Sequence, residues 1–172
     1  MKTLVQRAIK KDAECFIRLM EENKQSMLKV AYGFFSNEED VADVMQQTVL
    51  DAYEHIGELK KAAYFKTWLI RILINNCNQL YNSRKRIVMG EKLAEESYVD
   101  DYPQENTFFQ LLSLLQKDDR AVFWLYYGEG YTTKEISQIL DRNESTIRSR
   151  IRRGKEQIRR QIQGEEWIFY GK

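Results

Sequence analysis

Apolar side chains recur at spacings of three and four residues through most of this chain, and little interrupts the pattern. The 172 residues include one Pro and eight Gly, which are too few turn-forming residues for a fold of many short strands. Three long amphipathic segments predict helices in the first half, at about residues 12–35, 37–56 and 65–87. Four more are predicted at about 107–116, 118–127, 132–140 and 144–162. The sequence therefore predicts an all-α protein.

The apolar pattern fades between Val88 and Thr107. This stretch holds scattered charges and the single proline, Pro103. A segment without a sustained apolar period cannot bury one face against a core, so we interpret it as a linker. The chain is thus expected to form two small helical domains, residues 1–88 and 107–172, joined by residues 89–106. The second is expected to be a four-helix domain with a helix-turn-helix.

Charge is distributed unevenly along the chain, although the formal net charge is only +1. Residues 142–160 carry eight Arg or Lys and two Glu, whereas residues 91–119 carry eight acidic residues and two Lys. A basic module beside an acidic segment indicates a localised nucleic-acid contact rather than a general affinity for polyanions.

The segment from Tyr131 to Arg153 has the pattern of a helix-turn-helix. A short amphipathic helix is followed by the polar turn 141–143 and by a longer helix with an apolar stripe through Ile147, Ile151 and Ile158. Serine and arginine lie on the outward side, where small hydroxyls permit close approach and guanidinium groups can meet guanine edges or phosphates. The candidate DNA contacts are Ser145, Thr146, Arg148, Ser149, Arg152 and Arg153. An ordinary solvated basic helix is the alternative.

Two further polar faces are predicted in the first half. On the helix from Val41 to Ile56, an exposed leucine lies among polar groups, which suggests a protein partner; this face holds Asp43, Gln46, Gln47 and Leu50. The next helix carries one polar stripe, made of Arg71, Asn75, Asn78, Asn82 and Lys85, with further positive charge in the run 84–86. Amide groups can read base edges and basic groups can hold phosphates. A solvated face remains the alternative for both sets.

Aromatic residues at the start of the third helix are expected to divide between core and surface. Phe65 and Trp68 lie near the inward side of this helix, so we expect them to pack in the core. Tyr64 belongs to the preceding basic loop and is the better candidate for base stacking.

Several classes of protein are disfavoured. Cys15 and Cys77 form no CxxC pair and lie far from His55, so we expect two buried reduced thiols, no metal and no cofactor. There is no phosphate-binding loop and no nucleophile–base pattern, so an enzyme is not expected. The N-terminus lacks the apolar core of a signal peptide, and the longest apolar run, 121–127, is too short to span a bilayer. A cytoplasmic protein that is not itself a membrane protein is expected.

Two sets of motifs, in a fixed order, resemble those of the extracytoplasmic-function (ECF) sigma factors of the sigma-70 superfamily. In the first half they are EEDVADVMQQ (38–47) and FKTWLIRI (65–72); in the second half they are LLSLL (111–115), RAVFWLYYG (120–128) and YTTKEI (131–136). The resemblance covers nearly the whole chain except the linker and the tail. It implies an RNA polymerase sigma factor that directs promoter-specific initiation in a cell-envelope stress response.

The same resemblance implies partners and roles for individual residues. The first domain would hold the β′ clamp of core RNA polymerase, at Asp43 and Gln46 in particular, and would read the minus-ten element as locally single-stranded DNA. Asn75 lies where the family reads an unstacked base, and Leu59 where the family lines the pocket for that base. The second domain would bind the minus-thirty-five element as duplex DNA and the β flap. An anti-sigma factor, commonly membrane-anchored, would hold the protein inactive.

The chain departs from the family pattern at a few positions. Gln47 stands where an acid is common and Gly154 where alanine is usual, and we interpret both changes as tolerable. The loop from Glu58 to Tyr64 is the family's most variable part, so the promoter sequence does not transfer. The aromatic tail 165–172 has no counterpart and is expected to dock on the second domain or on a partner.

Two other classes of function remain open on the sequence. A stand-alone helix-turn-helix regulator would form a stable dimer and bind a palindromic operator without polymerase. An interaction module without DNA-binding activity would show no salt-dependent affinity for DNA.

Overall fold

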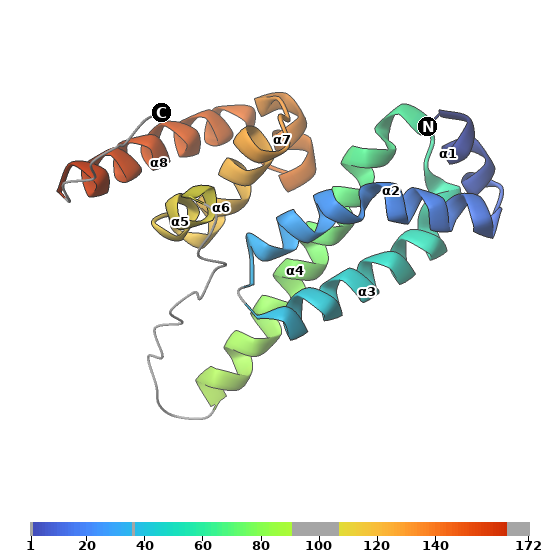
Figure 1. The fold of residues 1–172 in the computed structure, drawn as a ribbon, viewed down its shortest axis with the longest axis horizontal. Coiled ribbons are helices and arrows are strands. Elements are labelled where there is room, and N and C mark those ends of the chain that lie inside the picture. The colour runs from blue at the N-terminus through green and yellow to red at the C-terminus, as the bar shows by residue number, and fades with distance from the viewer. Residues whose placement is uncertain (1, 36, 91–106, 165–172) are drawn as a thin grey trace. The chain divides into compact units, whose positions relative to one another are not determined.

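The computed structural model describes residues 2–35, 37–90 and 107–164 (Figure 1). All regular secondary structure in these three ranges is helical, which confirms the predicted fold class. The chain divides into two compact units, residues 1–100 and residues 101–172. From residue 91 onward, the predicted linker lies outside the described residues, as does the tail from residue 165.

The first unit is built on three long helices that pack against one another. Its elements are α1 (Lys2–Ile9), α2 (Ala13–Tyr32), α3 (Glu38–His55), the short 3-10 turns η1 (Ile56–Glu58) and η2 (Ala62–Tyr64), and α4 (Phe65–Gly90). Every pair among α2, α3 and α4 is in contact, and the three helices lie together in Figure 1. The predicted helices correspond to α2, α3 and α4, although α4 continues past the predicted end at Ile87.

Side-chain caps fix where these helices begin. The side-chain oxygen of Asn37 accepts a hydrogen bond of 2.8 Å from the backbone N–H of Asp40, which confirms the predicted start of α3. Asp12 caps α2 in the same way and accepts from the N–H of Cys15 at 3.1 Å. Each cap satisfies a backbone donor that the first turn of a helix leaves unpaired.

The apolar pattern of the sequence does not predict α1. This helix has eight residues, and a helix so short is marginal unless tertiary packing supports it. The support comes from Val5 and Ala8, which are fully buried, and from contacts of α1 with α2, η1 and η2.

The core of the first unit contains most of the side chains that the apolar pattern predicts, but Trp68 and Ile17 depart from the prediction. Cys15 and Cys77 are buried free thiols, as expected, and Phe65 is buried whereas Trp68 is half-buried. Ile17 follows the apolar spacing of α2, yet its side chain is 61% exposed.

An ion pair joins the start of α3 to the C-terminal half of α4. The carboxylate of Asp40, 3% exposed, pairs with the guanidinium of Arg84, which is 42% exposed. The other oxygen of Asp40 accepts a hydrogen bond of 2.8 Å from the side chain of Asn37. The sequence pattern places Arg84 with the positive charge at the end of its helix, but in the structure its guanidinium pairs with the buried carboxylate of Asp40.

We expect Arg84→Met to lower the stability of the first unit by about 1–3 kcal/mol. Removing one partner of a fully buried pair costs about 3–5 kcal/mol, and the partial exposure of Arg84 reduces the loss because water can solvate Asp40 in the variant. Urea unfolding of the full chain measures the change. Arg71→Met is the matched control, because Arg71 is exposed on the same helix and its loss should cost no more than about 0.5 kcal/mol. Equal unfolding midpoints for the two variants would contradict the prediction.

The second unit is a four-helix domain with the predicted helix-turn-helix. Its elements are α5 (Thr107–Ser113), α6 (Lys117–Phe123), a π-helical turn (Trp124–Gly128), α7 (Thr133–Leu140) and α8 (Glu144–Gly164). The predicted helix 118–127 is therefore not α-helical throughout, because its last residues widen into the π-helical turn. Within this turn, Trp124 and Leu125 are buried whereas Tyr126 and Tyr127 are exposed.

Local sequence signals define both ends of α7. Thr132 and Glu135 form a reciprocal capping box, in which each side chain satisfies a backbone donor at the start of the helix. Asp141 ends the helix with φ +51, a left-handed conformation that Asp tolerates better than most residues. The short turn that follows lets Ile136 and Ile139 of α7 and Ile147 of α8 bury together in the core.

Candidate functional site

The outer face of α8 presents the predicted serine and arginine side chains. Ser145, Arg148, Arg152 and Arg153 are exposed, whereas Thr146 and Ser149 are half-buried. The hydroxyl of Ser149 donates to the carbonyl oxygen of Thr146 at 2.9 Å, so its lone pairs remain the groups that can accept from a ligand. The predicted set therefore lies on the surface of one helix, although its members differ in exposure.

The arginines on α8 are not equivalent. Arg148 donates at 2.7 Å to Glu144, one turn earlier on the same helix. Arg150, which flanks the apolar stripe, is half-buried and pairs with Asp119 of α6 at 3.2 Å. No carboxylate among residues 107–164 pairs with Arg152 or Arg153, so the guanidinium groups of these two residues can meet an anion in solution.

Glu144 connects the two helices of the helix-turn-helix. It accepts a hydrogen bond of 2.6 Å from the hydroxyl of Thr133 on α7, as well as the bond from Arg148. These hydrogen bonds, the one from Thr133 first, hold the pKa of the Glu144 carboxyl below its usual range. The carboxylate thereby fixes the N-terminal end of α8 against the start of α7.

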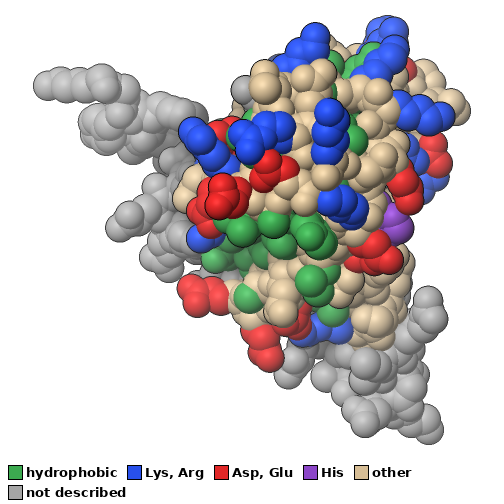
Figure 2. All heavy atoms as spheres, turned by 90° about the vertical axis from the view of Figure 1, so that its right-hand side faces the viewer, with side chains coloured by type: hydrophobic (Ala, Val, Ile, Leu, Met, Phe, Trp, Pro, Cys, Tyr) green, Lys and Arg blue, Asp and Glu red, His purple; other side chains and the backbone are tan. Residues whose placement is uncertain are grey.

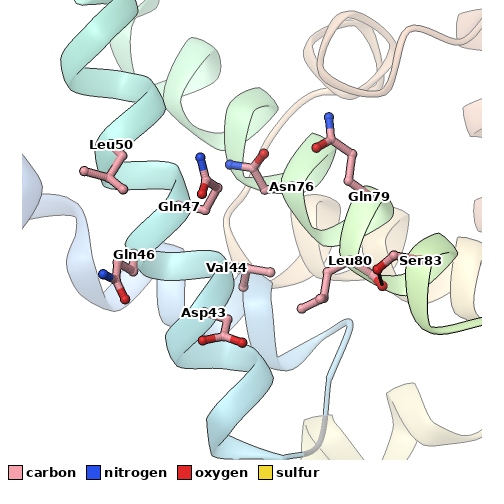
Figure 3. A pocket seen from close by; sticks show the side chains of 9 residues that line it. All are labelled: Asp43, Val44, Gln46, Gln47, Leu50, Asn76, Gln79, Leu80 and Ser83. Atoms are coloured by element: carbon pink, nitrogen blue, oxygen red, sulfur yellow. Dashed lines mark hydrogen bonds between the residues drawn. The ribbon is translucent and has the colours of Figure 1, made fainter. Parts of the chain in front are cut away.

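In the first unit, α3 and α4 line a groove of about 610 Å³ (Figure 3). All four residues predicted on the exposed face of α3 line it, and so do side chains of α4: Asp43, Val44, Gln46, Gln47, Leu50, Asn76, Gln79, Leu80 and Ser83. The side chain of Leu50 is 57% exposed, and the polar groups that line the groove with it are mostly amides, together with the carboxylate of Asp43 and the hydroxyl of Ser83. An apolar side chain in such a rim is typical of a protein-binding surface.

A buried amide that the sequence reading missed supports this groove. Asn76 donates to Asp51 Oδ2 at 2.8 Å and to Thr48 Oγ1 at 3.2 Å. Asp51 also accepts from Gln47 at 2.7 Å, so the network holds one of the predicted contact residues in place. The signal was available in the sequence, because Asn76 lies in phase with the buried stripe of α4 rather than with the exposed asparagines.

The polar stripe on α4 is exposed as predicted. Arg71, Asn75, Asn78 and Asn82 all face solvent. The side chain of Lys85 lies outside those that the structure describes. Exposed amides one and two turns apart can contact successive bases, because each amide both donates and accepts hydrogen bonds.

The loop that precedes α4 contains the two other predicted minus-ten residues. Leu59 is half-buried, and Tyr64 is 56% exposed with the ammonium of Lys61 at 5.8 Å from its ring. His55 Nδ1 lies 3.0 Å from a carboxylate oxygen of Glu58, and this contact raises the pKa of His55. Lys and Arg side chains occupy much of the upper part of the face drawn in Figure 2, which is the side of the first unit where α1 and the end of α3 lie.

Within residues 2–35, 37–90 and 107–164, no helix is long and apolar enough to cross a membrane. The same residues contain no cluster of three His, Cys, Asp or Glu side chains that could hold a metal ion.

Comparison with known proteins matches the two halves of the chain to two regions of one family, in the order that the sequence motifs predict. Residues 19–87 match the family model for sigma-70 region 2, and residues 97–158 match the model for sigma-70 region 4. The ECF RNA polymerase sigma-E factor of Haemophilus influenzae is 27% identical over 93% of this chain and 94% of its own length. The ECF RNA polymerase sigma factor SigW of Bacillus subtilis is 25% identical over 94% of this chain and 96% of its own.

Among solved structures, the fold is similar to that of the sigma factor RpoE of Bartonella quintana, crystallised in complex with the anti-sigma factor NepR. The TM-score is 0.72 at 20% identity, covering 86% of this chain and 96% of the other.

Proposed function

The chain belongs to the extracytoplasmic-function sigma factors of the sigma-70 family, and we propose that this RNA polymerase sigma factor uses three surfaces during initiation. The α3–α4 groove binds the β′ clamp of core polymerase. The exposed stripe of α4 and the loop before it read an opened minus-ten element. The outer face of α8 enters the major groove at the minus-thirty-five element, and its unit also contacts the β flap.

The DNA-binding part of this proposal rests on which arginines of α8 are exposed and unpaired with a carboxylate. Arg152 and Arg153 are exposed about two turns after Ser145 on α8 and have no described carboxylate partner. A guanidinium group with free donors can make a bidentate contact to the O6 and N7 atoms of guanine. Arg148 and Arg150 are less available because carboxylates already occupy their donors, so we rank Arg152 and Arg153 above Arg148 as base contacts.

The proposal for the minus-ten element depends on single-stranded DNA. Exposed Asn75 would meet an unstacked base, Leu59 would line the pocket for that base, and Tyr64 would stack on a neighbouring one. Amides provide hydrogen bonds to base edges that are accessible only after the duplex opens. Two weak DNA contacts on one promoter then combine through effective concentration, without tight binding at either site.

We further propose that the protein acts in the cytoplasm without catalytic activity of its own. An anti-sigma factor that covers its polymerase- and DNA-binding surfaces would hold it inactive until an envelope signal releases it.

In vitro transcription with core polymerase and a promoter library tests the function. We expect selective initiation at promoters with two conserved blocks, and only when both core enzyme and this chain are present. A stand-alone regulator would instead bind a palindromic site without core enzyme, and an interaction module would produce no salt-dependent DNA binding.

Arg152→Ala is expected to weaken use of the upstream block by about 1–3 kcal/mol, because the variant loses a base contact in the major groove. The matched control is Arg159→Ala. Arg159 is also exposed on α8, two turns further along the helix, and we expect its loss to change initiation little at any upstream sequence. Initiation rates on promoters with substituted upstream blocks provide the measurement. An unchanged upstream preference in Arg152→Ala would remove this side chain from the proposed contact.

A further inference from the structure

The turn between α1 and α2 reaches across the first unit to the end of α3. The ammonium of Lys11 donates to the backbone carbonyl oxygens of Tyr53 at 2.7 Å and Glu54 at 3.1 Å. The same ammonium lies 5.0 Å from the centre of the Tyr53 ring. These carbonyls belong to the last turn of α3, where a helix has acceptors without intrahelical partners and a partial negative charge. Lys11 therefore acts as a cap supplied from a distant part of the chain.

The backbone of Lys11 is held in an unusual conformation. Its φ is +65, a region that L residues other than Asn and Asp rarely occupy. The turn is closed by hydrogen bonds from the N–H groups of Lys10 and Lys11 to the carbonyls of Arg7 and Ala8, both 2.9 Å. Neighbouring Arg7 pairs with Asp12 at 2.7 Å. These backbone hydrogen bonds and the Arg7–Asp12 ion pair fix the turn, so the ammonium of Lys11 points at the last turn of α3.

The last turn of α3 leads directly into the loop that carries Leu59 and Tyr64. α3 ends at His55, and η1 begins at the next residue, Ile56, which is fully buried. α1 packs against both η1 and η2. The N-terminal segment therefore contacts both helical turns of the loop, while Lys11 fixes the helix end from which the loop departs.

From these contacts we infer that Lys11 is a positioning residue for base selection at the minus-ten element. The inference rests on the proposed function of the loop. Lys11 itself need not touch DNA: by holding the last turn of α3, it sets the position of Leu59 and so the shape of the base pocket. A shift of about 1 Å in such a group can change discrimination strongly while binding elsewhere persists.

The test separates positioning from stability with three variants of the full chain. Lys11→Met removes the ammonium and keeps an unbranched side chain at positive φ. Lys11→Gly also removes the ammonium, but glycine adopts positive φ without strain, so it should retain more stability than Lys11→Met. Lys11→Arg keeps a cation that can reach the same carbonyls. Lys24→Met is the control, because Lys24 is exposed on α2 and has no described partner.

The measurement is the ratio of initiation rates by the reconstituted holoenzyme on promoters that differ only at the captured minus-ten base. We expect that ratio to fall by about threefold or more in both Lys11→Met and Lys11→Gly, with recovery in Lys11→Arg and no change in Lys24→Met. Affinity for core polymerase, measured by fluorescence anisotropy, should stay unchanged in every variant, because Lys11 is not among the residues that line the α3–α4 groove.

Two results would overturn the inference. One is wild-type base discrimination in both Lys11→Met and Lys11→Gly. The other is a loss that follows only the melting temperature, so that the more stable Lys11→Gly discriminates like wild type. A wild-type chain that initiates at no promoter would instead refute the proposed function, and this outcome is distinct from both.

Discussion

A Gly154→Ala variant is expected to lose about 1–2 kcal/mol of stability in the C-terminal unit, although alanine is the better helix former. An alanine Cβ at this position would lie 2.3 Å from Cε2 and 2.6 Å from Cζ of Phe123, and 3.3 Å from a methyl carbon of Leu115. Phe123 is buried, so its ring can move only by displacing other core atoms. Overpacking of this kind costs about 1–3 kcal/mol, whereas replacing glycine by alanine in a helix returns about 0.5–1 kcal/mol.

Thermal unfolding followed by circular dichroism measures this effect, and a shift of about 4–8 °C per kcal/mol is expected for a unit of this size. The matched variant is Gly154→Ala combined with Phe123→Leu, in which the smaller side chain makes room for the new methyl group. We expect the second substitution to cost less in the alanine background than in the wild-type background, which a double-mutant cycle detects. A Gly154→Ala protein that melts at or above the wild-type temperature would show that the α6–α8 contact is not tight. The expectation also corrects our interpretation of this glycine as a tolerable replacement for alanine, because here the neighbouring ring requires it.

Leu50→Arg is expected to weaken binding to core polymerase by about 30-fold or more, since loss of a hot-spot side chain at the centre of an interface costs about 2 kcal/mol or more. Leu50 lies in the α3–α4 groove among amides and one carboxylate, that of Asp43, and arginine there removes the apolar contact and adds a charge that must be desolvated on binding. Fluorescence anisotropy of labelled protein titrated with core enzyme provides the affinity.

The control for this variant is Ile17→Arg. Ile17 is an aliphatic residue of similar exposure in the same unit, 61% against 57% for Leu50, and it does not line the groove. We expect its substitution to leave core binding unchanged. Equal losses in the two variants would indicate a general effect of the added charge and would count against the groove as the polymerase contact.

Much of the secondary structure could be predicted from local signals. Asn37 marks the start of α3 because a side-chain oxygen before a helical pattern satisfies a free N–H group. The pattern of the helix-turn-helix predicts α7 and α8 because its apolar spacing and polar turn are both local features. The asparagine stripe of α4 is exposed as its helical spacing predicts.

Long-range partners could not be predicted in the same way. The partner of Arg84 is Asp40, and the partner of Arg150 is Asp119; in the sequence all four are ordinary charged residues on helical faces. Ile17 follows an apolar spacing but is exposed, because the width of the buried face depends on which helices cover it. The helix α1 is supported by its contacts with α2, η1 and η2, which are not local to its own eight residues.

Local sequence patterns are enough to predict the helical class, the order of the two modules and the faces of α3, α4 and α8 that meet solvent. These properties follow from the period of an α-helix and from chemistry within a few residues. The packing of the helices, in contrast, sets which arginines of α8 have a carboxylate partner, which glycine the core requires and what holds the end of α3. These features depend on contacts between residues that are distant in the chain, such as Lys11 with the carbonyl of Tyr53. A local sequence pattern cannot show which distant residues pack together.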